Sequence, residues 1–509
     1  MRAGAQVWQE LTATLKLPAY SRKEIYACAA ACALGSVAAI AAAFGGKLAL
    51  LAIIGLLAGT VGVYIGMRHP LWLYYGTVIS VTTLPFGYFP GAHIPIYLVC
   101  GCGSMLAFLL HPRAVRRRSP LMSAVLLLIL MSAVSMIATF STPVNIMDFT
   151  KWGVATGFMF AALSLPNDEL VRLGKAVVYA CTFSGAVGII AVIQGTTKWI
   201  YKPFAIVGYH AADRFYITGG TMTQPRTGRF DVGQGSESFQ RLGGMWADPN
   251  AAGVGLVVGI AIAAILFAGW QRAALMTILG VAIVLTLSRA AMLSFGGGVA
   301  LVFIFHNMRA RDRRNIVAML LVAAAGAMAV PAVRTRLFGS LGSNDAGASD
   351  RMASLREFPM RLGNHWIFGR GWSLREFKDG PYAFTQNFVS NAYLIAIHRG
   401  GLIAGLSFLL AVVIACVVAG RLIRRNSLPH AFYGSTFIAF SVIALNLDHP
   451  VVVIAQMTFM YTFFLIFLEY SDELRKSGAL DAPKADPVPA VLKTKPVTAQ
   501  AVSLPAAAT

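Results

Sequence analysis

Long apolar stretches alternate with short polar connections along most of the chain. A helix of about 17 to 25 mainly apolar residues is long enough to cross a bilayer. This pattern predicts an all-α polytopic membrane protein with about 12 to 14 transmembrane helices. The expected spans lie at residues 25–44, 46–66, 71–90, 94–111, 120–140, 150–166, 174–194, 251–268, 272–287, 290–306, 315–331, 389–420, 430–447 and 452–470.

Two long polar connections interrupt the spans and give the chain its predicted organisation. Residues 1–24 are polar and precede no cleavable signal with a short apolar core, so the first apolar stretch is expected to stay in the membrane. The predicted segments are an N-terminal segment at 1–24, N-terminal transmembrane helices at 25–194, a first large loop at 195–249, central transmembrane helices at 250–331, a second large loop at 332–388, C-terminal transmembrane helices at 389–470 and a disordered tail at 471–509.

The composition excludes a soluble protein of this size. Of the 509 residues, 57% are hydrophobic and 12% are charged, which is too few charges to cover a soluble surface. The six cysteines all lie in apolar stretches and are interpreted as small core residues, so no disulfide framework and no metal site is expected. The sequence contains no P-loop and no dinucleotide fingerprint, so no cofactor is expected.

The formal net charge of +21 first suggests nucleic acid or another acidic partner, but the basic residues follow the membrane pattern. They gather at 112–118, 309–314, 421–425 and in the tail, all on one side of the predicted topology, whereas the short connections on the other side hold only Lys47, Lys151 and Arg289. Cytoplasmic loops carry an excess of Lys and Arg. Both termini are therefore expected in the cytoplasm and both large loops in the periplasm, and nucleic-acid binding is not expected.

Arg289 stands between two apolar stretches, in the sequence IVLTLSRAAMLSFG. An arginine at the centre of a bilayer is costly. The predicted topology instead places Ser288 and Arg289 in a short outer turn, on the side where both large loops emerge.

The two large loops are rich in arginine. A guanidinium offers paired donors to phosphate oxygens and keeps its charge, so the group suits an anionic ligand; a solvated surface with ordinary ion pairs is the alternative. The arginines are Arg214, Arg226, Arg229 and Arg241 in the first loop, and Arg351, Arg356, Arg361, Arg370 and Arg375 in the second.

A short helix is predicted at 349–362, within the second loop. Ser349 or Asp350 is the expected cap, and Arg351 lies in the first turn. The helix would carry Arg351 toward Arg289, or its apolar stripe would pack on the bundle, or both. The stripe comprises Met352, Leu355, Phe358 and Leu362.

Two further segments border the loops. RLGGMWADPNAAG, at 241–253, is a Gly/Pro turn in which Asp248 or Asn250 is expected to cap the next helix. FVSNAYLIAIHRGGLIAG, at 388–405, opens a span with Asn391 and places His398 and Arg399 more than a turn inside it, where they are expected to line a cavity. The glycines that follow are expected to allow close helix packing.

Together these segments resemble the O-antigen ligase and O-antigen polymerase family of bacterial polysaccharide assembly. The resemblance rests on RLGGMWADPNAAG, LTLSRAA, DRMASLREFPMRLGNHWIFGRGW and SNAYLIAIHRGGLIAG, which occur in the family's order across residues 241 to 405.

The resemblance implies a metal-independent glycosyltransferase of the inner membrane whose site faces the periplasm. Its donor would be a glycan on undecaprenyl pyrophosphate, and its acceptor a lipid-linked glycan or lipid A-core. A polysaccharide chain-length regulator or a flippase would be a partner. By position, Arg289 and Arg351 would hold the pyrophosphate, with His398 as a catalytic candidate. The expected substrate-binding residues are Arg241, Asn250, Ser288, Ser390, Asn391 and Arg399.

The chain departs from the family pattern at two positions. Ser390 stands where the family often has the histidine proposed as the base of the ligases, and Arg399 stands where it often has glutamate. The missing histidine favours a polymerase, or a divergent member of the family, over a ligase. His398 lies about two helical turns beyond Ser390, on roughly the same face, and is the candidate replacement. A transporter of anionic lipids or solutes is the alternative from another class.

Overall fold

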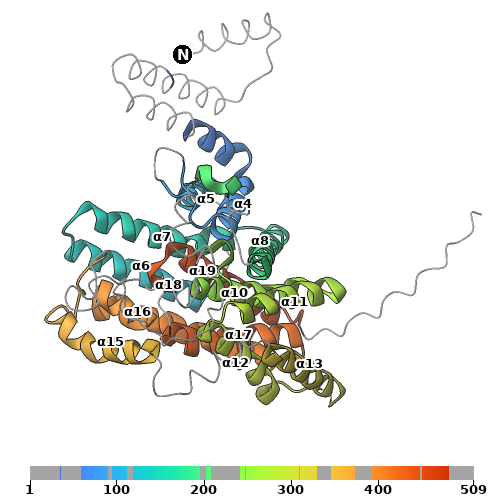
Figure 1. Ribbon diagram of the computed structural model, residues 1–509. Coiled ribbons are helices and arrows are strands. Elements are labelled where there is room, and N and C mark those ends of the chain that lie inside the picture. Colours follow the sequence, from blue (N-terminus) through green and yellow to red (C-terminus); the bar gives the residue numbers. More distant parts are fainter. Residues whose placement is uncertain are drawn as a thin grey trace, which may run out of the picture.

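The computed structural model is a bundle of helices (Figure 1). It describes residues 35, 59–89, 94–111, 119–194, 202–207, 241–246, 248–308, 310–329, 346–372, 391–447 and 450–480. Within these ranges, an isolated antiparallel bridge between Tyr88 and Pro95 is the sole β pairing. The predicted fold class is confirmed: the chain is an all-α polytopic membrane protein.

The helices follow the predicted apolar spans closely. Span 25–44 lies outside the described residues except for residue 35, and span 46–66 is described only from residue 59, so the total of 12 to 14 remains a prediction. The elements are α4 (Pro70–Thr83), α5 (Ile96–Leu110), α6 (Pro120–Ala138), α7 (Pro143–Leu163), α8 (Asn167–Gln194), η1 (Lys202–Val207), η3 (Gly244–Trp246), α10 (Pro249–Leu266), α11 (Gly269–Leu285), α12 (Arg289–Phe305), α13 (Ala310–Ala329), α15 (Ala346–Leu362), α16 (Ala392–Ile423), α17 (Leu428–Leu447), α18 (Pro450–Val453) and α19 (Ala455–Lys476).

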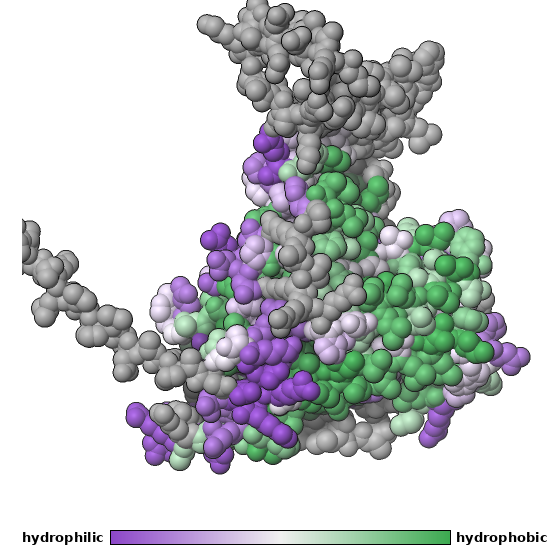
Figure 2. All heavy atoms as spheres, turned by 180° about the vertical axis from the view of Figure 1, so that it is seen from behind, coloured by the Kyte–Doolittle hydropathy of each residue, from purple (hydrophilic) through white to green (hydrophobic). Residues whose placement is uncertain are grey.

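Five of these helices are long and apolar enough to cross a membrane: α6, α8, α10, α16 and α17. Three shorter apolar helices, α5, α11 and α12, accompany them. Figure 2 shows a broad hydrophobic surface on one face of the molecule, with hydrophilic residues toward both ends of the bundle. A bilayer solvates such a surface between its two polar interfaces, which agrees with a membrane-embedded bundle.

The helix starts obey local capping chemistry. Ser119 caps α6, and its hydroxyl accepts a hydrogen bond from the Met122 amide. The Asp248 carboxylate caps α10 by accepting from the amides of Asn250 and Ala251, and Pro249 occupies the first turn. These side chains satisfy amide donors that have no partner within the helix. The cap predicted at Asp248 is thereby confirmed.

Helices α10 and α19 form the centre of the bundle. Almost all of α10 is buried, and its small residues let neighbouring helices approach closely. In α19 the aromatic side chains Phe459, Phe463 and Phe464 are fully buried and pack edge-on against rings of other helices. The core therefore combines a small-residue helix with an aromatic one.

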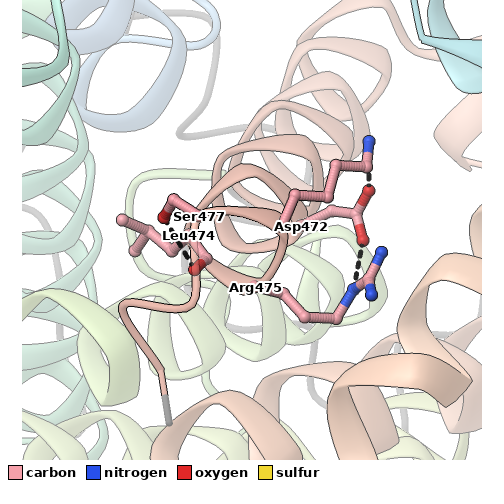
Figure 3. Close-up of polar contacts among 5 residues, drawn as sticks. Asp472, Leu474, Arg475 and Ser477 are labelled. Atoms are coloured by element: carbon pink, nitrogen blue, oxygen red, sulfur yellow. Dashed lines mark hydrogen bonds and ion pairs between the residues drawn. The ribbon is translucent and has the colours of Figure 1, made fainter. Parts of the chain in front are cut away.

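The last turn of α19 is closed by a cluster of charges (Figure 3). The buried Asp472 carboxylate accepts from Arg475 Nε and pairs with Lys476 Nζ, each at 2.7 Å. The Ser477 hydroxyl donates to the Leu474 carbonyl at 3.0 Å. Burial raises the pKa of Asp472, but the hydrogen bonds and charges of Lys476 and Arg475 outweigh it, so the net pKa lies below the ordinary value.

The helix predicted at 349–362 is present as α15, but the predicted cap is wrong. The helix begins at Ala346, so Ser349 and Asp350 lie inside it. The apolar stripe is only partly buried, because Phe358 and Leu362 pack on the core while Met352 and Leu355 are exposed. Packing on the bundle therefore involves only the second half of the stripe.

Candidate functional site at one end of the bundle

The predicted site residues that the structure describes lie at one end of the bundle. His306, directly after α12, hydrogen-bonds through Nδ1 to the Ile423 carbonyl at the end of α16 (2.9 Å), which places these two helix ends together. The opposite ends of the same helices begin at Arg289 and Ala392 and share the other end of the bundle. In Figure 1, α13 and α15 correspondingly lie at opposite sides of the molecule.

The first group of residues is organised by Arg241. Its Nε donates to the Thr286 carbonyl at 2.9 Å, and its Nη2 donates to Asn250 Oδ1 at 3.0 Å. The next amide, of Leu242, donates to the Leu285 carbonyl at 2.9 Å. One guanidinium therefore joins the end of the first large loop to the start of α10 and to the turn between α11 and α12.

Backbone conformation fixes the same loop end against α8. Gly244 has φ +51°, a conformation that side-chain-bearing residues rarely adopt, and a Cβ there would lie 2.7 Å from the Ser184 carbonyl oxygen. The Ser184 hydroxyl accepts from the Met245 amide at 3.1 Å. The Gly-Gly pair predicted as a turn thus allows close approach of two backbones.

The turn that carries Arg289 is tightly built. Leu287 has φ +49°, which is uncommon for a residue with a branched side chain. Ser288 is buried and caps α12 by accepting from the Ala291 amide at 3.5 Å. Gly253 of α10 lies directly below, where a Cβ would come within 3.1 Å of Ser288 Cβ. The structure therefore brings together Arg241, Asn250, Ser288 and the half-buried Arg289, as the topology predicted.

The second group lies at the start of α16. Asn391 caps the helix by accepting from the amides of Tyr393 and Leu394, and its Nδ2 donates to Asn446 Oδ1 at 3.1 Å. His398 is fully buried. Arg399 is also buried, donates from Nη1 to the Val452 carbonyl at 3.0 Å, and lies over the Trp372 ring with its Cζ 5.3 Å from the ring centroid.

Arg399 lines a small cavity, as the sequence predicted. The cavity of about 20 Å³ has room for roughly one water molecule. His398 does not line it. The lining residues are Leu128, Ser132, Trp152, Trp372, Ala396, Arg399, Gly400, Ala404, Phe408 and Val452.

Helix α16 is broken at Gly401, directly after the stretch that carries His398 and Arg399. Gly401 has φ +68° and ψ −173°, which is not helical. Residues 402–420 contain no charge and, at 1.5 Å per residue, extend roughly 28 Å, close to the thickness of a bilayer core. His398 and Arg399 lie in the short first part of α16, before this uninterrupted apolar helix, and their depth in the membrane stays a prediction.

The break accommodates a segment of the second large loop, residues 363–372, which we call the outer segment. A Cβ on Gly401 would lie 1.9 Å from the Ile367 carbonyl oxygen, so the two backbones are in direct contact. The Leu402 amide donates to the Trp366 carbonyl, and the Arg370 amide donates to the His398 carbonyl, both at 2.7 Å. Among the glycines predicted to allow close packing, Gly401 does so against this segment.

Sequence reasoning missed the residues that hold the outer segment. Ser135 Oγ donates to the Phe368 carbonyl, and Asn145 Nδ2 donates to the Trp372 carbonyl. The Trp372 ring packs against Phe149 and Trp152. Nothing in the sequence pairs residues of α6 and α7 with a loop more than two hundred positions away, although the glycine spacing of GRGW was a signal for close backbone approach.

Two predicted residues cannot be placed in the site. Ser390 lies outside the described residues, and Arg351 lies on α15 with its side chain outside the described part of the structure. Arg370 is half-buried at the outer segment. The loop arginines Arg214, Arg226, Arg229 and Arg375 also lie outside the described residues.

The fold and the site define a class: a polytopic α-helical membrane protein with arginines gathered at one end of its bundle. Residues 273–409 match the family model described as O-antigen ligase, which covers α11 to the first half of α16 and includes Arg289 and His398. The match supports assignment of the chain to the O-antigen ligase and polymerase family. No curated protein matches the chain.

Proposed function

We propose that this protein is a membrane glycosyltransferase of surface-polysaccharide assembly that works at the periplasmic face. It transfers glycan from an undecaprenyl-pyrophosphate carrier to a lipid-linked glycan or to lipid A-core. The coarser part, a membrane enzyme of polysaccharide assembly in the O-antigen ligase family, follows from the family match. The finer part is carried by one observation: Arg241 ties the first large loop to the turn that begins α12 with Arg289.

In the proposed reaction, an acceptor hydroxyl oxygen forms a bond to the anomeric carbon while the bond from that carbon to the pyrophosphate breaks. The lipid pyrophosphate leaves with the electron pair, and the hydroxyl proton passes to a base. The reaction needs positive charge where the pyrophosphate leaves. Arg289 is half-buried and directly follows the turn at Leu287 and Ser288, and its guanidinium offers paired donors to phosphate oxygens. Arg351 of α15 is the proposed second ligand.

His398 is the candidate base because it lies about two helical turns beyond Ser390, the position at which the family often has its histidine. It is fully buried behind the outer segment, and the Arg370 amide covers its carbonyl. Because the side chain is fully buried, its use as the base requires its surroundings to open and admit the acceptor hydroxyl. If the His398→Gln variant transferred glycan at the wild-type rate, His398 would not be the base.

The arginine role is tested with purified protein in lipid nanodiscs, a lipid-linked donor and no nucleotide sugar. Arg289→Ala is expected to lower transfer by about 100-fold or more, as for loss of one charge-stabilising donor, with Arg289→Lys recovering only part. The matched control is Arg313→Ala, which removes an exposed arginine at the opposite end of the bundle. Transfer by Arg289→Ala at the level of the control would refute the assignment.

The choice between polymerase and ligase is tested in a deletion strain. We favour the polymerase, because Ser390 replaces the family's histidine. Surface glycan reduced to a single repeat is the expected result. Polymer that accumulates on the lipid carrier, with none on lipid A-core, would identify a ligase instead. Movement of the donor lipid across the bilayer without any transfer would favour a transporter.

A further inference from the structure

The outer segment and the last turn of α15 before it carry large apolar side chains that the bundle does not cover. Met360, Trp366, Ile367 and Phe368 are all exposed, and Met360 and Ile367 are 72% and 60% exposed. We call these four residues the apolar tip. The segment contacts the bundle mainly through its backbone and through Trp372, so these contacts leave the tip uncovered. Four large apolar side chains so close in sequence form an exposed patch that needs a partner.

Hydrogen bonds place the tip level with the ends of two apolar helices. The Trp366 carbonyl accepts from the amide of Leu402, the first residue of the uninterrupted apolar part of α16. The Phe368 carbonyl accepts from Ser135, in the last turn of α6. The tip therefore lies where the membrane-spanning part of both helices ends.

The tip is continuous with the lipid-facing surface of those helices. Leu402 and Leu406 are exposed on α16, and Ile137 is exposed on α6. Leu402 and Ile137 are each within two positions of a hydrogen bond that holds the outer segment. Both helices are long and apolar enough to cross a membrane. The lipid acyl chains that cover the exposed residues of these helices are thus adjacent to the tip.

Several polar backbone groups around the tip are hydrogen-bonded within the protein. Besides the two carbonyls named above, the Gly369 amide donates to the His365 carbonyl at 2.9 Å, and the Arg370 amide donates to the His398 carbonyl. Non-helical backbone is tolerated at membrane depth only where protein or water satisfies it. The outer segment meets this condition at these groups, and its polar residues Asn364 and His365 are exposed.

From these observations we infer that the apolar tip inserts among the acyl chains of the outer leaflet, at the level of the headgroup boundary. The apolar tip is then an interfacial membrane anchor rather than part of an aqueous loop. Trp366 fits this depth, because tryptophan favours the boundary between acyl chains and headgroups. Arg361, next to Met360, pairs with Glu357 one turn earlier in α15 (3.5 Å), so its charge has a partner within the helix. The inference goes beyond the proposed function and does not depend on it.

The experiment uses the full-length protein with its native cysteines replaced, in liposomes of phosphatidylethanolamine and phosphatidylglycerol. A spin label is attached at Ile367→Cys, and collisions with oxygen and with a water-soluble nickel chelate are compared. Asn364→Cys is the exposed polar control in the same segment, and Leu406→Cys is the lipid-facing reference in α16. The label at 367 is expected to favour oxygen severalfold, like the label at 406 and unlike the label at 364.

Two results would overturn the inference. A label at 367 that collides with the nickel chelate as often as the label at 364 would place the tip in water. A label shielded from both reagents would place it under protein, such as a second copy of the chain.

A second measurement keeps the native cysteines and compares the tryptophan fluorescence of wild type and Trp366→Phe. Lipids brominated on the acyl chain should quench wild type more than the variant, because Trp366 lies among the acyl chains. If the emission that Trp366 contributes were quenched by water-soluble acrylamide instead, the inference would fail.

Discussion

Gly401 is the residue on which the seating of the outer segment depends. Its φ of +68° and ψ of −173° fall in a region open almost only to glycine, and a Cβ would meet the Ile367 carbonyl oxygen at 1.9 Å. We expect Gly401→Ala to lower the free energy of unfolding by at least about 2 kcal/mol and to expose residues 363–372 to protease. Thermal unfolding and limited proteolysis of the purified protein measure both effects.

Gly420→Ala in the same helix is the matched control. No atom lies within 4 Å of a Cβ at position 420, and alanine favours the helix more than glycine does. The control is expected to keep or raise the midpoint of thermal unfolding. Equal behaviour of the two variants would show that the break at Gly401 is not required.

Arg241 was predicted to bind substrate, but its hydrogen bonds give it a second role as a tie between segments. Arg241→Ala removes the donors to Thr286 and Asn250, so we expect a loss of about 2 kcal/mol in the free energy of unfolding. Arg241→Lys keeps the charge and cannot make both bonds, so it should recover little of this loss. Unfolding midpoints and the KM for the donor are measured together. A raised KM with an unchanged midpoint would contradict the tie and favour direct binding.

At the scale of elements, the sequence predicts helices better than it predicts their ends and breaks. A stretch of about twenty apolar residues forms a helix in a bilayer, because the helix satisfies its own backbone hydrogen bonds. Helices α6, α10 and α17 accordingly appear where expected. The break in α16 was missed because Gly400, Gly401 and Gly405 are equally consistent with close packing of an unbroken helix. The helix breaks at Gly401 because the backbone of Ile367 lies against it. This contact joins two distant segments, and the periodicity of the sequence cannot predict it.

The C-terminal turn of α19 yields a prediction about pH. The folded pKa of Asp472 lies below its ordinary value of 3.8, because the hydrogen bonds of Lys476 and Arg475 outweigh burial. The carboxylate therefore stabilises the fold fully at a pH above the pKa that Asp472 has in the unfolded chain. This stabilisation is lost as the pH falls through the pKa of Asp472 in the folded protein. At pH 7, Asp472→Asn is expected to lower the free energy of unfolding by about 1 to 2 kcal/mol and to speed amide exchange in the last turn. Both differences from wild type should shrink below about pH 4.

Asp148 provides the comparison for this charge cluster. It pairs with Lys151 at 3.2 Å, but both side chains are partly exposed, so Asp148→Asn should change the stability by less than about 1 kcal/mol. Amide exchange followed by mass spectrometry reports the two helix regions separately. If the amides of the last turn of α19 exchanged no faster in Asp472→Asn than in wild type at pH 7, the charge cluster would not stabilise this turn.

At the scale of the whole molecule, charge asymmetry predicted which residues share an end of the bundle. It placed the end of the first large loop and the turn before Arg289 on the same side, and in the structure Arg241 joins that loop end to this turn. It could not predict that Arg399 would stack on Trp372, or that a loop segment would occupy the end of α16. Those features arise from packing between distant segments, which hydropathy and charge counting do not register.

The orientation of the bundle in the membrane follows from the same asymmetry and remains a prediction. The end defined by His306 and Ile423 carries a dense set of basic residues, and short cytoplasmic connections retain such residues during insertion. We therefore expect Asn426→Cys, exposed between α16 and α17, to face the cytoplasm. Ser141→Cys, exposed between α6 and α7 at the other end, should face outward. The basic residues are Arg311, Arg313, Arg314, Arg421, Arg424, Arg425, Arg475 and Lys476.

Labelling of intact cells with a membrane-impermeant maleimide tests this orientation. The cysteine at 141 should react in intact cells, and the cysteine at 426 only after the membrane is opened. The reverse pattern would place Arg289, Arg241 and the outer segment in the cytoplasm, where a periplasmic glycan donor does not reach. Because both reporter positions lie on described connections of the bundle, this one experiment tests the topology independently of any activity.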